Sequence, residues 1–283
     1  MEGRPETSQP ETYYPPTYTP EPTQPRPWWK GALGVLGAAA LILIKFGAKL
    51  KGVLLLLPKL KLFTTSASML VSVGAYALIW GWKFAVGFVL LLLVHEMGHV
   101  WQARREGLEA SAPLFIPFLG AAIALKSLGK DASVEARVGL AGPIAGSLAC
   151  CVPLGIWLAT DEPFWQALAF VGFFLNLFNL APVLPLDGGR AMSALTPWMW
   201  FVGYGLLVAV TFLAPNPIMF LILLFGGLET WRRWKMRKQP DQQRFYTVPA
   251  RTRAAVALTY VGLAVALAVG MEATFLERDF DDV

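Results

Sequence analysis

The chain is poor in the residues that build polar or cross-linked proteins. Its 283 residues include only two histidines and two cysteines, and charged residues make up 15%. The cysteines are adjacent, Cys150 and Cys151, and neighbouring cysteines rarely pair, so we expect packing roles and no disulfide framework. Hydrophobic residues reach 55%, above the roughly 45–50% of soluble domains. This composition excludes an ordinary soluble enzyme and favours a membrane protein.

Long apolar segments predict an all-α polytopic membrane protein, a bundle of about six to eight transmembrane helices. Each predicted span has close to the roughly 17–25 residues that a membrane helix needs. The predicted spans are residues 66–82, 84–103, 138–159, 164–184, 198–214 and 254–271, with 217–229 as a shorter one. Lysines interrupt residues 31–57, which therefore either span the membrane or form an interfacial hairpin with snorkelling lysines.

Polarity divides the chain into one membrane core and flanking parts. Residues 1–30 form a Pro-rich tail with too few aliphatic residues for a core and without the pattern of a signal peptide. The other parts are a membrane-associated or spanning segment (31–65), the core (66–229), a basic loop (230–253) and a C-terminal helix with an acidic tail (254–283). No polar part is long enough for a further domain of about 50 residues.

Basic residues cluster in loops on one side of the predicted membrane. The net charge of +5 therefore reflects the positive-inside rule and not nucleic-acid binding. We place these loops in the cytoplasm and expect a multi-pass protein of the cell membrane. Arg104, Arg105 and Arg190 either mark the mouth of a cytoplasmic water channel or are solvated loop residues.

Both histidines lie in one pentapeptide, His95-Glu96-Met97-Gly98-His99, inside a predicted span. Ionisable groups at bilayer depth are costly and indicate function. Residues four apart on a helix lie about 40° apart on one face, so both imidazoles can reach one zinc ion. Glu96 lies beside that ion, where a general base is needed, and Gly98 faces away and serves packing. The alternative is a pair of hydrogen-bonded core histidines.

A catalytic zinc ion usually has three protein ligands, and the sequence has no third histidine. The third ligand must then be a carboxylate. Asp187 is the best candidate, because it ends an apolar segment in which Pro182 and Pro185 break the helix. The following Gly188 and Gly189 allow the backbone to turn tightly against a neighbour. The alternative is an ordinary loop aspartate or helix cap.

HEMGH, followed roughly ninety residues later by NLAPVLPLDGG, resembles the site-2 protease family of intramembrane zinc metalloproteases. The resemblance covers residues 66–229 and lacks the peptide-binding or nucleotide-binding regulatory domains of some relatives. It implies one zinc ion per chain and hydrolysis by zinc-activated water. The basic loops place this active site towards the cytoplasmic side. The implied site residues are His95, His99 and Asp187 as zinc ligands, Glu96 as catalytic base, and Asn179 for the substrate backbone or oxyanion.

Two other segments bear on this resemblance. Residues 113–125 are apolar but too short to span, which favours a re-entrant strand or hairpin near the active site; the alternative is a surface loop. An exposed strand edge could pair with an extended substrate. In LAGPIAG, Gly146 stands where many relatives have Asn, and Gly142 and Gly146 could equally serve close helix packing. Asn176 could assist the site or hydrogen-bond a neighbouring helix.

The sequence therefore predicts an intramembrane zinc metalloendopeptidase that hydrolyses peptide bonds of transmembrane or membrane-proximal substrates, as in regulated intramembrane proteolysis. Its expected partners are a transmembrane protein or peptide and the lipid bilayer, with no nucleic acid. One alternative is a catalytically silent membrane-binding scaffold of the same fold. Another is a prenyl-protein-type membrane peptidase, against which the LDGG sequence argues.

Overall fold

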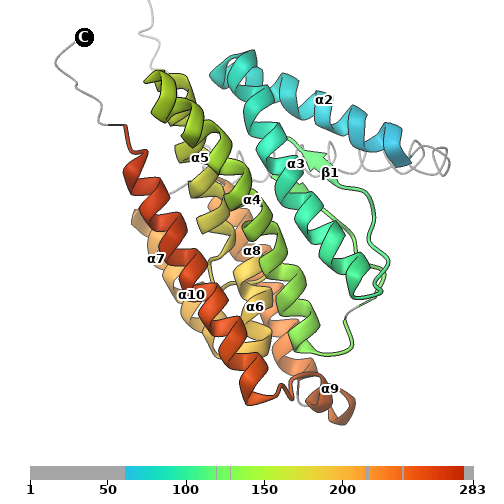
Figure 1. Cartoon of the computed structure of the whole chain (residues 1–283). Coiled ribbons are helices and arrows are strands. Elements are labelled where there is room, and N and C mark those ends of the chain that lie inside the picture. The colour runs from blue at the N-terminus through green and yellow to red at the C-terminus, as the bar shows by residue number, and fades with distance from the viewer. Residues whose placement is uncertain (1–60, 119, 128, 214–216, 238, 277–283) are drawn as a thin grey trace, which may run out of the picture. The chain divides into compact units, whose positions relative to one another are not determined.

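A computed structural model of the chain is shown in Figure 1. The structure describes residues 61–118, 120–127, 129–213, 217–237 and 239–276. Our predictions for the Pro-rich tail, for residues 31–57 and for the acidic end of the chain (277–283) lie outside these described residues.

The described chain is helical apart from one small hairpin, in agreement with the predicted helical fold class. Its helices are α2 (Lys61–Trp80), α3 (Trp82–Arg105), α4 (Ala132–Thr160), α5 (Pro163–Asn179), α6 (Asp187–Leu195), α7 (Met199–Leu213), α8 (Pro217–Met236), α9 (Pro240–Phe245) and α10 (Ala250–Ala273). Among these, α3, α4 and α10 are long and apolar enough to cross a membrane. The larger number of spans stays a prediction.

Helix α4 lies at the centre of the bundle and packs against α3, α5, α6 and α10 (Figure 1). Gly98 brings α3 close to α4, as expected. A Cβ atom on Gly98 would lie 2.4 Å from the carbonyl oxygen of Ala141 and 2.7 Å from the Cβ atom of Ala145. The backbones can approach this closely only because a glycine faces the small residues of α4.

The sequence predicts a span over residues 164–184, but α5 ends at Asn179. Ala181 precedes Pro182, and a residue before proline is pushed out of the helical conformation. The freed carbonyl of Leu180 accepts a hydrogen bond from the hydroxyl of Tyr260 in α10 at 2.5 Å. The chain then turns back, so that Asp187 begins a new helix inside the bundle.

The start of α6 is pressed against the turn that precedes it. A Cβ atom on Gly188 would lie 1.9 Å from the carbonyl oxygen of Leu180, and one on Gly189 would lie 2.5 Å from that of Val183. The two glycines therefore permit the tight approach that the sequence predicts. The buried indole of Trp200 in α7 donates a hydrogen bond to the Gly189 carbonyl at 2.7 Å, which fixes α6 from the other side.

The hairpin predicted within residues 113–125 is present. Strands β1 (Leu114–Ile116) and β2 (Gly120–Ala122) are antiparallel, with Phe115 opposite Ala121. β1 lies against α2, where the hydroxyl of Ser68 accepts a hydrogen bond from the Phe115 amide at 3.2 Å. β2 contacts α3, and within the described residues its outer edge pairs with no other strand.

Helix α8 is longer than the predicted span of residues 217–229, and basic residues are among the additional ones. We expected residues 230–253 to form a loop, whereas α8 continues through its basic C-terminal turn to Met236 and α9 follows. Arg233 explains the extension, because it is largely buried and ion-paired with Glu135 of α4 and Glu229 of its own helix, at 2.5 and 2.8 Å. These pairs hold the end of α8 against the bundle.

We predict that Gly98→Ala lowers the free energy of unfolding by about 1–3 kcal/mol, because the added methyl group overpacks the contact between α3 and α4. Gly155→Ala on α4 is the matched control, since nothing lies within 4 Å of the Cβ position there and alanine favours a helix. Denaturant unfolding of the detergent-solubilised protein measures both. Equal stability of the two variants would contradict this packing account.

Candidate metal centre

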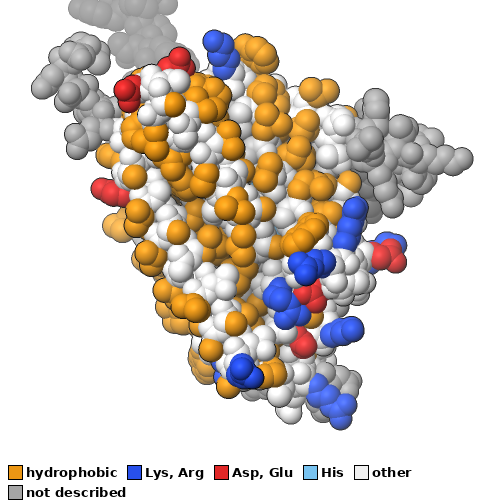
Figure 2. Space-filling model, viewed as in Figure 1, with side chains coloured by type: hydrophobic (Ala, Val, Ile, Leu, Met, Phe, Trp, Pro, Cys, Tyr) orange, Lys and Arg blue, Asp and Glu red, His pale blue; other side chains and the backbone are white. Residues whose placement is uncertain are grey.

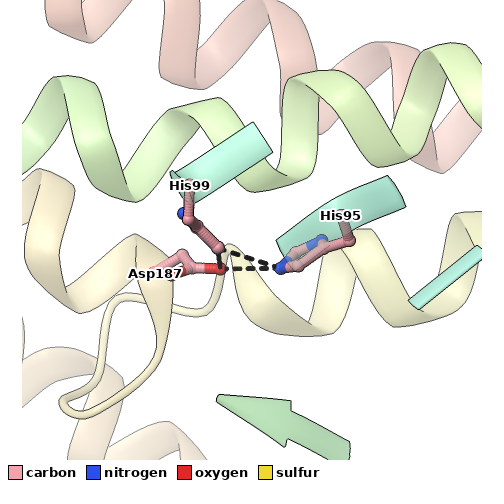
Figure 3. A group of neighbouring side chains, drawn as sticks. All are labelled: His95, His99 and Asp187. Atoms are coloured by element: carbon pink, nitrogen blue, oxygen red, sulfur yellow. Dashed lines mark hydrogen bonds and ion pairs between the residues drawn. The ribbon is translucent and has the colours of Figure 1, made fainter. Parts of the chain in front are cut away.

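His95 and His99 project from α3 towards Asp187, the first residue of α6 (Figure 3). Oδ2 of Asp187 lies 3.1 Å from Nε2 of His95 and 3.0 Å from Nε2 of His99. The two Nε2 atoms lie 3.1 Å apart. All three side chains are buried. Two nitrogens and one oxygen, from residues about ninety positions apart, therefore meet at one point.

The other nitrogen of each imidazole has a partner that only accepts hydrogen bonds. Nδ1 of His99 donates to the carbonyl oxygen of Val138 at 2.7 Å. Nδ1 of His95 donates to Oδ1 of Asn176 at 2.8 Å. The amide of Asn176 is oriented by its nitrogen, which donates to the Gly172 carbonyl at 2.8 Å. Both neutral imidazoles therefore carry their proton on Nδ1 and leave Nε2 unprotonated.

The three converging atoms consequently present lone pairs to one another. Such an arrangement is repulsive unless a cation or additional protons lie between the atoms. Ligands held at 2.0–2.1 Å around a tetrahedral zinc ion lie about 3.3 Å apart, close to the observed 3.0–3.1 Å. Histidines that bind metals also usually donate their second nitrogen to a carbonyl or carboxylate. The residues fit a transition-metal site with two nitrogen ligands and one oxygen ligand.

Two glycines of α4 provide the space for this arrangement. A Cβ atom on Gly142 would lie 2.1 Å from Nε2 of His99, and one on Gly146 would lie 2.1 Å from Oδ1 of Asn176. Both positions therefore serve close packing, one of the two interpretations that the sequence allows.

The sequence did not indicate that Asn176 contacts the predicted metal ligand His95. Asn176 hydrogen-bonds a neighbouring helix, as one of our two interpretations had it, but its partner is His95 itself. Asn179, one turn later, donates instead to the Leu175 carbonyl of its own helix at 3.0 Å. Its role in substrate binding stays a prediction.

Glu96 follows His95 on α3 and is 5% exposed. Within the described residues, its carboxylate takes part in no hydrogen bond or ion pair that would occupy it. A buried carboxylate next to two converging imidazoles can accept a proton from a water molecule held there. The structure thus brings the three predicted ligands together, and the role of Glu96 as catalytic base stays a prediction.

Arg190 lies one turn after Asp187 and is not a solvated loop residue. Its side chain is 16% exposed, and its guanidinium lies 4.0 Å from Oδ1 of Asp187 and 4.0 Å from Oε1 of Glu135. Through Glu135 it adjoins the ion pair of Arg233. The sequence does not indicate that Glu135 and Arg233 lie near the site, because only the fold brings the start of α4 and the end of α8 together. Arg104 and Arg105 are exposed, as the interpretation as solvated residues predicts, but they belong to the last turn of α3 and not to a loop.

Comparison with known proteins agrees with this geometry. The sequence profile described as Peptidase family M50 matches residues 83–161 and 159–203. A zinc metalloprotease of Methanocaldococcus jannaschii is 29% identical over 153 residues, which cover 51% of this chain and 44% of that protein. Rip3 of Mycobacterium tuberculosis, also named a zinc metalloprotease, is 33% identical over 156 residues, 49% of this chain and 38% of that protein. The chain thus spans less than half the length of these two relatives.

We predict that Asn176→Ala weakens metal binding about 10- to 100-fold, because His95 loses the acceptor that fixes its ring and tautomer. Asn179→Ala is the matched control and should leave metal affinity unchanged, since its amide bonds only its own helix. Competition for zinc against a chromophoric chelator measures both affinities. Unchanged affinity in the Asn176 variant would remove it from the support of His95.

Proposed function

Because this chain belongs to peptidase family M50, we propose that it is an intramembrane zinc metalloendopeptidase that hydrolyses peptide bonds of transmembrane or membrane-proximal substrates. The convergence of unprotonated Nε2 atoms of His95 and His99 on the carboxylate of Asp187 carries the proposal. The relatives' names as zinc metalloproteases support the choice of metal. One zinc ion per chain is expected.

The proposed ligand atoms are Nε2 of His95, Nε2 of His99 and Oδ2 of Asp187. When bound, zinc supplies Lewis-acid chemistry that polarises a water molecule and the scissile carbonyl. The position of Asp187 at the start of α6 favours its ionised form, because unpaired amides give a helix N-terminus a partial positive charge. Asn176 and the Val138 carbonyl keep both imidazoles in the tautomer that binds a metal.

Glu96 is the proposed general base and acid. It takes the proton from the attacking water and then donates it to the leaving amine, which keeps the proton count balanced. Asn179 is the proposed contact to the substrate backbone or to the oxyanion. For that role its amide must exchange its hydrogen bond to the Leu175 carbonyl for one to the substrate.

The hairpin is the proposed place for the substrate chain. A transmembrane helix has its backbone amides in internal hydrogen bonds, so it must unwind locally before hydrolysis. The outer edge of β2 offers main-chain donors and acceptors to such an extended segment, and β2 contacts the helix that carries His95 and Glu96. An edge that holds the unwound segment would stabilise it beside the catalytic base.

We further propose a multi-pass protein of the cell membrane with its active site towards the cytoplasm. His99 lies in the C-terminal half of α3, which ends at Arg104 and Arg105. The basic C-terminal turn of α8 lies near the same end, since Arg233 pairs with Glu135 in the first turn of α4. Basic residues favour the cytoplasmic side.

We predict that Glu96→Gln retains stoichiometric zinc and loses cleavage by about 10²–10⁴-fold, the usual contribution of a general base. Membrane proteomics of cells that express the wild type or this variant would identify accumulated substrates, and a reconstituted substrate would give the rates. Metal analysis of the same preparations is the control. Cleavage that persists would exclude the role of Glu96, and no accumulated substrate would favour the silent scaffold.

Asp187→Ala is expected to lose most of its bound zinc, because removal of the carboxylate leaves two imidazole ligands where a catalytic site needs three. Ser193→Ala is the matched control, because Ser193 is buried in the same helix and is not one of the three grouped residues. Metal content after dialysis against a weak chelator measures the difference. Stoichiometric zinc in the Asp187 variant would remove Asp187 from the ligand set.

A further inference from the structure

A cavity of about 490 Å³ lies between α3, α4 and α10, and none of its described lining residues belongs to the metal centre. Its walls are mostly aliphatic. The lining includes Gly98 and Trp101 of α3, Ala141 and Leu148 of α4, and Ala255 and Thr259 of α10. We refer to this cavity as the α10 groove. Ala255 and Thr259 have short, exposed side chains, which leave the groove open to the outside of the bundle.

The α10 groove is too small to enclose another helix. Its lining on α4 runs from Arg137 to Leu148, a length of about 16 Å at 1.5 Å per residue. A helix of that length with a diameter of 10–12 Å would fill more than about 1,200 Å³, whereas the cavity holds about 490 Å³. A single hydrocarbon chain fits such a groove.

Charge is concentrated at one end of the α10 groove. Gln102 and Arg137 line that end, where Arg137 is paired with Glu106 at 2.6 Å. Arg105 lies over the Trp101 ring, 4.9 Å from its centroid, and Arg251 and Arg253 flank the lining residue Thr252 on exposed positions. Figure 2 shows basic side chains, with acidic ones among them, gathered at the lower right of the view beside a broad apolar surface.

We propose that the α10 groove binds one acyl chain of an anionic glycerophospholipid. The chain would lie along α4 towards Leu148, and the phosphate would lie at the basic end beside Arg105 and Arg251, as anionic head groups do near clustered arginines. The bound lipid would complete the packing of α10 against α3 and α4. It would also cover Gly98, the point where the metal-binding helix contacts α4.

The test compares lipid retention by the full chain and two α10 variants. Ala255→Phe fills the groove, and Leu258→Phe, on the outward face where Leu258 is 78% exposed, is the matched control. Each protein is reconstituted with phosphatidylglycerol and phosphatidylethanolamine and analysed by native mass spectrometry. The wild type and Leu258→Phe should retain one phosphatidylglycerol, and Ala255→Phe should retain about tenfold less, because burial of about two methylene groups is lost. Equal retention by all three proteins, or no preference for phosphatidylglycerol, would overturn the proposal.

A second measurement identifies the occupant. A photo-reactive amino acid at Thr259 should form adducts with phospholipid, and the adducts should disappear when Ala255→Phe is added. Adducts with residues 31–57 of the same chain or with a second copy would overturn the lipid assignment. Neither readout depends on catalysis, so a failure here is distinguishable from a failure of the proposed peptidase activity.

Discussion

The structure depends on holding three lone pairs close together in a nearly apolar interior. Two imidazole nitrogens and a carboxylate oxygen repel one another until a cation lies between them, so the fold must hold them rigidly beforehand. It does so from three sides: the Val138 carbonyl fixes one ring, Asn176 fixes the other, and the glycine pair after Asp187 presses α6 against the turn. The cost of burying these groups is offset only when the site binds its metal.

Small residues make this arrangement possible. Gly142 and Gly146 of α4 stand where any side chain would collide with His99 or Asn176, and Gly98 lets α3 approach α4. Membrane helices gain little from the hydrophobic effect when they associate in lipid, so close backbone approach and buried hydrogen bonds contribute more of their association energy. The same residues therefore serve both the stability of the bundle and the geometry of its site.

Much of the site could be predicted from sequence, because its strongest signals are local. A pair of histidines four apart is a property of one helix, and the break before Asp187 follows from two prolines and two glycines. The hairpin followed from an apolar segment too short to span. What escaped prediction depends on tertiary contacts: the hydrogen bond from His95 to Asn176, and the ion pair that continues α8 beyond its apolar part by joining Arg233 to Glu135. No spacing rule relates such distant positions.

The hydrogen bond from the Tyr260 hydroxyl shows that residues beyond the profile-matched region support the site. The hydroxyl donates a hydrogen bond to the carbonyl of Leu180, where α5 ends. Tyr260 nevertheless lies more than fifty residues beyond the last position matched by the family profile. A fragment cut after residue 203 would leave that oxygen without a hydrogen-bond donor in a water-poor interior, next to the turn that positions Asp187. The part of the chain that the profile matches therefore depends on α10, which stabilises the turn before Asp187 through the hydroxyl of Tyr260.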